Sequence, residues 1–160
     1  MGIVVSGIEN LIVSLANMAD RTSRGSREQM EQGAVDIRDL ARLYAPVDKG
    51  NLEDAIKTGK ELHGAWERGV NRRNIFTVEI DEDMPFEKLN KNGTTTIGKV
   101  GDYSTRMHED WTYNLGVLSE LKAQQTGMPV GPKFLERAME DLDETIKAKV
   151  ESRINQGIGH

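Results

Sequence analysis

The segment from Ala45 to Leu52, with the sequence APVDKGNL, makes the chain change direction directly after a strongly periodic stretch. A proline disfavours the α conformation in the residue before it, so Pro46 is expected to end the preceding helix. Asp48 can accept a hydrogen bond from a backbone amide a few residues later, and Gly50 can adopt the positive φ of a tight turn. Asn51 is then placed to cap the next element. We interpret the segment as a corner between a helix and a sheet, which is compatible with a further role in assembly.

Two segments before this corner have the apolar spacing of helices, so N-terminal helices are expected over about residues 3–44. The first runs from Ile8 to Ala19, and the second runs from Arg27 to Tyr44 with Ser26 as its expected N-cap. Residues off the second stripe are mostly charged, as expected for a helix with one buried face. The stripes comprise Ile8, Leu11, Ile12, Leu15, Met18 and Ala19, and then Met30, Ala34, Ile37, Leu40, Ala41 and Tyr44.

The middle of the chain, over about residues 52–112, is expected to hold a small sheet. In the stretch 74–81, apolar side chains alternate with their neighbours at the period of a half-buried strand. The Asn92-Gly93 pair lies between β-prone flanks, which predicts a hairpin that stays exposed unless another surface covers it. The stretch 52–62 fits a helix or a strand equally well, and apolar residues four apart in 103–111 favour one or two helical turns.

A long helix is expected to close the chain, over about residues 132–154. Residues 124–131 should form a loop, because glycine and proline interrupt any regular pattern there, and Pro132 suits the first helical turn. The tail 155–160 is expected to fray. One apolar stripe runs along the helix: Leu135, Met139, Leu142, Ile146, Val150 and Ile154. Together the elements predict a single α+β domain, in which long N-terminal and C-terminal helices pack on a small, mostly antiparallel sheet with an extended exposed hairpin.

Composition narrows the classes of function. The formal net charge of −5 and the 29% of charged residues describe a mildly acidic chain, which argues against general binding to nucleic acid. The absence of cysteine excludes disulfides and thiolate chemistry. The apolar stretch 3–15 contains Glu9 and Asn10, lacks a basic leader and is too short to span a bilayer. We therefore expect neither a signal peptide nor a membrane-spanning helix.

The densest group of titratable residues is His108-Glu109-Asp110. A metal-dependent hydrolase would need ligands and a base of these kinds, so His108 and Glu109 define one alternative function. Adjacent residues diverge by about a hundred degrees around a helix, however, so a satisfied or exposed histidine beside two surface acids is the simpler interpretation. The sequence has no glycine-rich phosphate loop, nucleophile elbow or two-histidine zinc motif. We expect no enzyme, no cofactor and no metal.

Two charged patches of opposite sign flank the stretch 74–81. Head-to-tail contact between copies of the chain would bring them together, because charge complementarity sets the register of an interface. The simpler interpretation is that both patches are solvated rims of one hairpin. A further basic run, with Arg21, Arg24 and Arg27, either contacts an acidic partner such as DNA or forms a solvated loop. The candidate contacts between subunits are Arg68, Arg72 and Arg73 on one side and Glu79, Asp81, Glu82 and Asp83 on the other.

Two motifs that lie far apart in the chain carry a resemblance to a known family. The first is the corner segment APVDKGNL at residues 45–52. The second is GPKFLERA at residues 131–138, which opens the terminal helix. In this order, over roughly residues 28–150, the chain resembles the head–tail joining or tail-completion proteins of tailed bacteriophages, which include relatives of the lambda minor tail protein Z. Lys49 stands where threonine is usual in that family. The corner motif is carried by Ala45, Pro46, Val47, Asp48, Gly50, Asn51 and Leu52.

The resemblance implies a structural virion protein, without catalytic residues, that forms a ring in the neck of the virion after assembly in the host cytoplasm. The ring is expected to be a hexamer of this chain. Its expected partners are the connector or portal-side neck proteins and the tail terminator or tail tube, with passive contact to genomic DNA in the lumen and no membrane contact. A tail terminator or a connector in an adjacent neck layer is the alternative within this class. Two alternatives belong to other classes of function. One is the metal-dependent hydrolase with His108 and Glu109, and the other is a DNA-contacting module with Arg21, Arg24 and Arg27.

Overall fold

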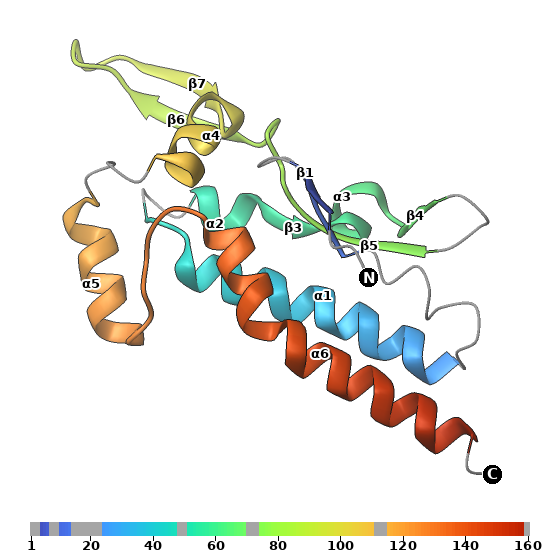
Figure 1. Ribbon diagram of the computed structural model, residues 1–160. Helices are drawn as coiled ribbons and strands as arrows, with labels where there is room; N and C mark the ends of the chain where they lie inside the picture. Colours follow the sequence, from blue (N-terminus) through green and yellow to red (C-terminus); the bar gives the residue numbers. More distant parts are fainter. Residues whose placement is uncertain are drawn as a thin grey trace.

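Two long helices lie side by side in the fold and a small sheet lies against one of them (Figure 1). The helices are α1 (Arg24–Tyr44) and α6 (Phe134–Ile158), and α1 contacts β3 and β5 of the sheet. The predicted α+β architecture is thereby confirmed. No helix among the described residues is both long and apolar enough to cross a membrane. This computed structural model describes the backbone of residues 4–6, 10–13, 24–47, 51–69, 74–110 and 115–158.

The main sheet is antiparallel and is built around its longest strand. Its strands are β1 (Val4–Ser6), β2 (Asn10–Val13), β3 (Ile56–Thr58), β4 (Glu67–Arg68) and β5 (Asn74–Ile80). Strands β2 and β3 flank β5, β4 pairs with the first residues of β5, and β1 extends the sheet beyond β2. The register places Val78 opposite Leu11 on one side and opposite Thr58 on the other. The strand predicted over residues 74–81 is therefore the centre of the sheet.

The first predicted N-terminal helix is wrong, because the chain forms strands there. Within the stripe from Ile8 to Ala19, residues Asn10–Val13 form β2, which pairs with β1 on one side and with β5 on the other. The periodicity of a short apolar run does not separate a helix from a strand. Pairing on both edges satisfies the backbone groups of β2 without a helix. Residues 14–23 lie outside the described part of the chain.

The second predicted N-terminal helix is α1, and its predicted apolar stripe is buried. The helix ends at Tyr44, as expected from the following proline. It begins at Arg24, so Ser26 is a buried residue within the first turn and the predicted N-cap is wrong. The buried members of the stripe are Met30, Ala34, Ile37, Ala41 and Tyr44, with Leu40 packed partly buried against them.

The corner after α1 leads into the sheet through two short helices. Helix α2 (Asn51–Ala55) includes the asparagine that was expected to cap it, and α3 (Gly59–His63) follows β3. Thr58 caps α3, since its hydroxyl accepts a hydrogen bond from the Glu61 amide while the Glu61 carboxylate accepts one from the Thr58 amide. This stretch, ambiguous from the sequence, thus alternates helix, strand and helix. Residues 48–50 of the corner lie outside the described residues.

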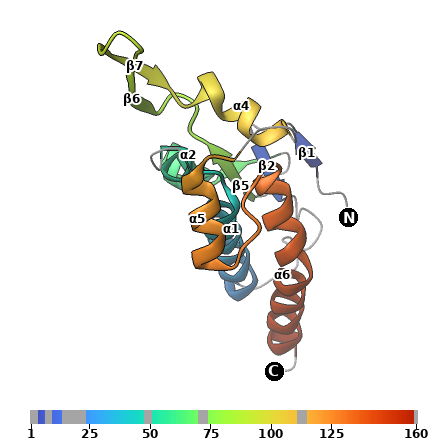
Figure 2. The same cartoon turned by 90° about the vertical axis from the view of Figure 1, so that its left-hand side faces the viewer.

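The predicted hairpin is confirmed, and it projects beyond the body of the protein (Figures 1 and 2). Its strands are β6 (Pro85–Leu89) and β7 (Thr95–Lys99), joined by a turn in which Gly93 has a φ of +81°. Helix α4 (Gly101–Glu109) follows β7 and contains the helical turns expected in this region. The hairpin therefore stands on α4 at its base.

Three boundaries near the C-terminus differ from those expected. Helix α5 (Val117–Thr126) extends into the predicted loop and ends at Gly127, whose φ of +68° makes a left-handed C-cap. Helix α6 begins at Phe134 rather than at Pro132, so the proline lies before the helix and not in its first turn. The helix also continues to Ile158, beyond the end expected at about residue 154.

Helix α6 lies along α1 (Figure 2), and the apolar stripe predicted for it belongs to the same core cluster as the stripe of α1. Gly33 brings the two helices close together, because a Cβ at this position would lie 3.0 Å from Ile146 Cγ2. The stripe is buried at Leu135, Met139, Ile146 and Val150 and partly buried at Leu142 and Ile154.

Replacing Ile37 with alanine is expected to lower the free energy of unfolding by about 2–5 kcal/mol, because the residue is 1% exposed and its truncation leaves a cavity. The matched control is Leu43→Ala in the same helix, where the residue is 38% exposed and the loss should stay below about 1 kcal/mol. Urea unfolding followed by circular dichroism measures both. Equal losses for the two variants would contradict the burial of this stripe.

Candidate functional site

The corner motif forms a junction between three helices. The Lys122 ammonium of α5 donates hydrogen bonds to the carbonyl oxygens of Arg42 and Ala45, at 2.5 and 2.9 Å. It also lies 2.6 Å from Glu53 Oε1 in α2. Helices α1, α2 and α5 are therefore held together at the corner by one lysine. Nothing in the sequence near Lys122 marks it for this role, because it is 77 residues from Ala45.

The described side chains of the corner motif behave as parts of a structural corner. Ala45, Pro46 and Leu52 are buried, whereas Val47 and Asn51 are half-buried. The Val47 amide adds a further link to α5, because it donates a hydrogen bond to the hydroxyl oxygen of Ser119 at 2.9 Å. A role of this motif in contacts between subunits stays a prediction.

The second motif, at residues 131–138, meets the same end of α1. The Gly131 amide donates to the carbonyl oxygen of Tyr44 at 2.9 Å, and the Arg137 guanidinium lies over the Tyr44 ring, 4.7 Å from its centroid. The Tyr44 hydroxyl donates to Asp141 Oδ2 at 2.5 Å. This hydrogen bond, and then burial, raise the pKa of Tyr44. The two motifs, separated by about half of the chain, therefore meet at the same end of α1.

The predicted acidic patch lies beside basic side chains of its own chain. Three of its four acids have such a partner: Glu79 lies 3.1 Å from His63, Asp81 2.8 Å from Lys57 and Asp83 2.6 Å from Lys99. On the basic side, Arg68 is exposed in β4, while Arg72 and Arg73 lie outside the described residues. A contact between these patches in neighbouring copies stays a prediction. The acidic patch has fewer carboxylates without a basic neighbour than the sequence alone indicates.

The basic run proposed for DNA contact is described only in part. Arg21 and the side chain of Arg24 lie outside the described residues, and Arg27 forms an ion pair with Glu31 at 3.2 Å along α1. A DNA-contacting role for this run stays a prediction.

A partly buried cluster of titratable side chains brings the two candidate hydrolase residues together with Lys133, just before α6, and with Glu136 in the first turn of α6. His108 is fully buried, with Nε2 2.6 Å from Glu136 Oε2 and Nδ1 3.2 Å from Glu109 Oε1. The two atoms of the shorter contact, Nε2 and Oε2, lie close together without forming a hydrogen bond. The Lys133 ammonium binds Glu109 and lies 3.4 Å from Glu136. The Phe134 ring packs edge-on against the imidazole, with 4.8 Å between ring centroids.

The contacts within this cluster favour charged carboxylates. The hydrogen bond from Lys133 lowers the pKa of Glu109 despite its partial burial. Burial opposes the ionisation of Glu136, but His108 and Lys133 outweigh it and lower the pKa of this carboxyl as well. Burial also disfavours the Lys133 ammonium, yet its two carboxylate partners raise its pKa above the usual value.

A divalent metal is one possible use of this cluster, and Lys133 argues against it. One potential ligand atom each from His108, Glu109 and Glu136 lie within 4.8 Å of one another. The Lys133 ammonium, however, contacts both carboxylates and already supplies the positive charge that a metal would bring. Its backbone is held too, since Lys133 has a φ of +55° and its amide donates to the carbonyl oxygen of His108 at 2.7 Å. The cluster therefore acts as an ionic link between α4 and α6.

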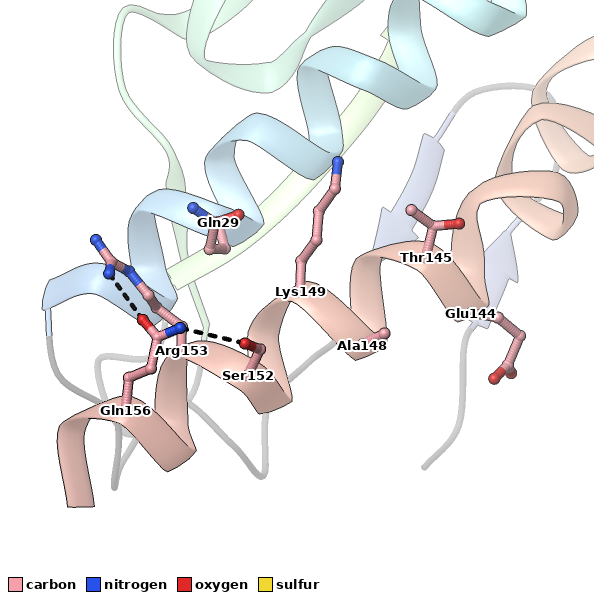
Figure 3. A pocket seen from close by; sticks show the side chains of 8 residues that line it. All are labelled: Gln29, Glu144, Thr145, Ala148, Lys149, Ser152, Arg153 and Gln156. Carbon is pink, nitrogen blue, oxygen red and sulfur yellow. Dashed lines mark hydrogen bonds between the residues drawn. The ribbon is translucent and has the colours of Figure 1, made fainter. Parts of the chain in front are cut away.

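A groove of about 720 Å³ runs along α6 beside the start of α1 (Figure 3). Lys149 lies 3.4 Å from Asp36, and Arg153 donates to Gln156 Oε1 at 3.1 Å. The Gln156 amide donates to the Ser152 hydroxyl oxygen at 3.4 Å, so the serine faces an amide and not a general base. This lining is suited to surface contact rather than to catalysis. It consists of Gln29, Glu144, Thr145, Ala148, Lys149, Ser152, Arg153 and Gln156.

Two apolar patches remain exposed on the described surface. The hairpin patch comprises Leu89 and Ile97, which are 65% and 70% exposed. The α5 patch comprises Val117, Leu118 and Leu121, which are 70%, 52% and 45% exposed. Clustered apolar side chains in contact with water mark surfaces that bind other molecules. The sequence indicates the first patch through the predicted hairpin, whereas the second depends on which side of α5 faces the body.

The chain matches no protein-family model, and comparisons with curated proteins and with solved structures give no significant match.

Replacing Glu136 with glutamine should lower stability near neutral pH by about 1–3 kcal/mol, because the carboxylate charge that faces His108 and Lys133 becomes a neutral amide. The folded pKa of Glu136 lies below its unfolded value of about 4.3, so its ionised form stabilises the fold above that pH and the contribution is lost as the pH falls through the folded pKa. The variant should therefore lose less stability than the native chain between about pH 5 and pH 3.

The matched control is Glu140→Gln, which changes an exposed residue of the same helix. Thermal unfolding measured across this pH range should give the native profile for the control. An acid profile of Glu136→Gln that coincides with the native one would contradict the proposed ionic link.

Proposed function

We propose that the chain is a structural virion protein of a tailed bacteriophage, which forms a ring at the head–tail interface and joins or completes the tail. The observation that carries this proposal is the presence of two separate exposed apolar patches, one on the hairpin and one on α5. A ring is built from heterologous contacts, in which one surface of a subunit meets a different surface of the next. The chain has two different surfaces of the kind that such a contact needs.

The hairpin supports a role in assembly because two strands alone are only marginally stable in water. At its base, Phe86 packs edge-on against Tyr103, with 5.2 Å between ring centroids. Lys99 lies 2.6 Å from Asp83 at the same end. Further out along the hairpin, Leu89 and Ile97 are exposed, and no described part of the chain covers them. A neighbouring subunit would cover them and stabilise the hairpin.

The family resemblance supports a position in the phage neck. Its two motifs converge on the end of α1, where Gly131 binds the Tyr44 carbonyl and Arg137 covers the Tyr44 ring. Because both motifs meet at one helix end, their presence in the same chain supports kinship with the family more strongly than isolated matching residues would. On this basis the partners are the connector or portal-side neck proteins and the tail terminator or tail tube, around a ring of six copies with DNA passing through its lumen.

Two other roles are weaker proposals. A tail terminator or a connector in an adjacent neck layer would use the same kind of surfaces and differs only in its neighbours. A metal-dependent hydrolase with His108 and Glu109 would have to displace Lys133, whose ammonium is bound by both carboxylates of the cluster.

Deleting the gene in the phage that encodes the chain is expected to leave filled heads and finished tails unjoined, because the ring that connects them is missing. Supplying the chain in trans should restore joined particles, and Glu140→Gln serves as a control variant that restores them equally well. An antibody against the chain should label the head–tail junction in electron micrographs. Normal virions formed without the chain, or label elsewhere on the particle, would overturn the proposal.

A further inference from the structure

We propose that Asn92 is a site of intramolecular covalent modification, at which the backbone nitrogen of Gly93 attacks the side-chain amide, and that the closed hairpin turn prevents this reaction. The reaction therefore takes place in chains whose hairpin is open. Asn92 is the only asparagine in the chain that is followed by glycine. A glycine leaves the approach of its own nitrogen unhindered, because it has no side chain. The reaction requires no second copy of the chain, so it does not depend on the proposed ring.

The reaction needs water and no other reagent. The Gly93 nitrogen gives up its proton to solvent and forms a bond to Cγ of Asn92, while the bond from Cγ to Nδ2 breaks and ammonia leaves. Water then opens the resulting cyclic imide at one of its carbonyl carbons. Opening at Cγ gives aspartate, whereas opening at the main-chain carbonyl carbon gives isoaspartate, in which the main chain runs through Cβ and Cγ. Either product adds a negative charge to the turn.

The hydrogen bonds of the hairpin turn identify its geometry. The Gly93 amide donates to the carbonyl oxygen of Asn90 at 2.9 Å, and the Asn90 amide donates to that of Thr94 at 2.8 Å. Lys91 and Asn92 both have a negative φ, whereas Gly93 has a φ of +81°. A four-residue turn that is closed by such a hydrogen bond and has a negative φ at both central residues is a type I turn. The glycine in the left-handed region then completes a common hairpin loop.

This geometry holds the two reacting atoms apart. The third residue of a type I turn has a ψ of about 0°, which places Cβ of Asn92 at a torsion of about 120° from the Gly93 nitrogen around the Cα–C bond. Ring closure needs Cβ and this nitrogen to be nearly eclipsed, because only then can Cγ and the nitrogen approach to reacting distance. The proton of the Gly93 amide is also engaged, since it is donated to the Asn90 carbonyl oxygen. The closed turn therefore keeps both the nitrogen and its proton away from the reaction.

The side chain of Asn92 is held as well. Its Oδ1 accepts hydrogen bonds from the Thr94 amide at 3.1 Å and from the Thr94 hydroxyl at 2.7 Å. Such a contact with the amide two residues later fixes the asparagine side chain. The two donors would stabilise the oxyanion of the attack only if the Gly93 nitrogen could reach Cγ, which the turn prevents. Asn92 and Gly93 are both exposed, so the hydrogen bonds of the turn, and not burial, exclude the reaction.

The isoaspartate product marks a chain permanently as one whose hairpin has opened. It lengthens the main chain of the turn by one atom, which moves the Gly93 amide away from the Asn90 carbonyl oxygen. The turn then no longer fits the pairing of Leu89 with Thr95, because the turn geometry fixes the register of a hairpin. Aspartate leaves the main chain unchanged and still offers an oxygen to Thr94. The hairpin therefore closes again after one outcome and not after the other.

Peptide mass spectrometry measures the conversion of Asn92 directly, in the native chain and in the same chain unfolded by urea at the same mildly alkaline pH. Conversion in the native chain should be at least about tenfold slower, because its rate scales with the fraction of chains whose turn is open. Asn90, which is followed by Lys91, is the internal control and should react more slowly than Asn92 in the unfolded chain. Equal rates at Asn92 in the two states, or no conversion of Asn92 in the unfolded chain, would overturn the proposal.

Removing the Thr94 hydroxyl tests whether the turn itself protects Asn92. Thr94→Val loses the hydrogen bond from this hydroxyl to Asn92, so the folded variant should convert about two to ten times faster than the native chain. The matched control is Thr95→Val, which makes the same change at the next residue, also exposed, and should react at the native rate. Circular dichroism verifies that both variants are folded. A rate for Thr94→Val at or below the native rate would contradict the protection proposed here.

Hydrogen exchange tests the permanent mark. The chain that contains isoaspartate at position 92, separated by chromatography, should exchange the amide hydrogens of β6 and β7 faster than the native chain, because its hairpin cannot close in register. Asn92→Asp is the control, since it adds the same charge without the additional main-chain atom, and it should exchange like the native chain. Equal exchange in the isoaspartate chain and in Asn92→Asp would show that the hairpin closes after either product, and the mark would then be ruled out.

Discussion

The fold depends on how the last carbonyl groups of α1 find hydrogen-bond donors. A helix end leaves these groups without partners in the helix, and burying them unpaired would cost free energy. Here the Lys122 ammonium binds two of the carbonyl oxygens at the corner, and the Gly131 amide binds that of Tyr44. A positive charge at this position is further favoured by the helix dipole. Because the donors come from α5 and from the segment before α6, one helix end organises the C-terminal third of the chain.

The surfaces proposed for assembly are positioned from this junction. Polar contacts at the corner hold the inner side of α5 and leave its apolar residues facing solvent. On the other side, the cluster of His108, Glu136 and Lys133 ties α4 to the start of α6, and the hairpin stands on α4. Both patches are therefore carried by elements that are anchored to the α1 and α6 pair. A rigid placement of two unlike surfaces is what a closed ring requires, because small errors in angle accumulate from subunit to subunit.

The candidate sites show which kinds of residue a sequence can reveal. His108 and Glu109 stand out as adjacent titratable groups, but the character of their site depends on Glu136 and Lys133, which come from another helix. An ammonium placed between two carboxylates turns a possible metal site into an ionic link. Likewise, the acidic residues 79–83 form a patch in the sequence, while the fold sets basic side chains of the same chain beside most of them. Such pairings have no local signal and could not be predicted.

The sequence by itself determined the features that local chemistry controls. Pro46 ended α1, the periods of α1, α6 and β5 identified their buried faces, and the Asn92-Gly93 pair located the hairpin. Only the tertiary structure decided that residues 10–13 are a strand, because β2 gains its hydrogen bonds from partners distant in sequence. It also decided which side of α5 remains in water and that the two motifs form one unit. These outcomes depend on hydrogen bonds and packing between distant segments, whose free energy outweighs the weak preferences of a short run of residues.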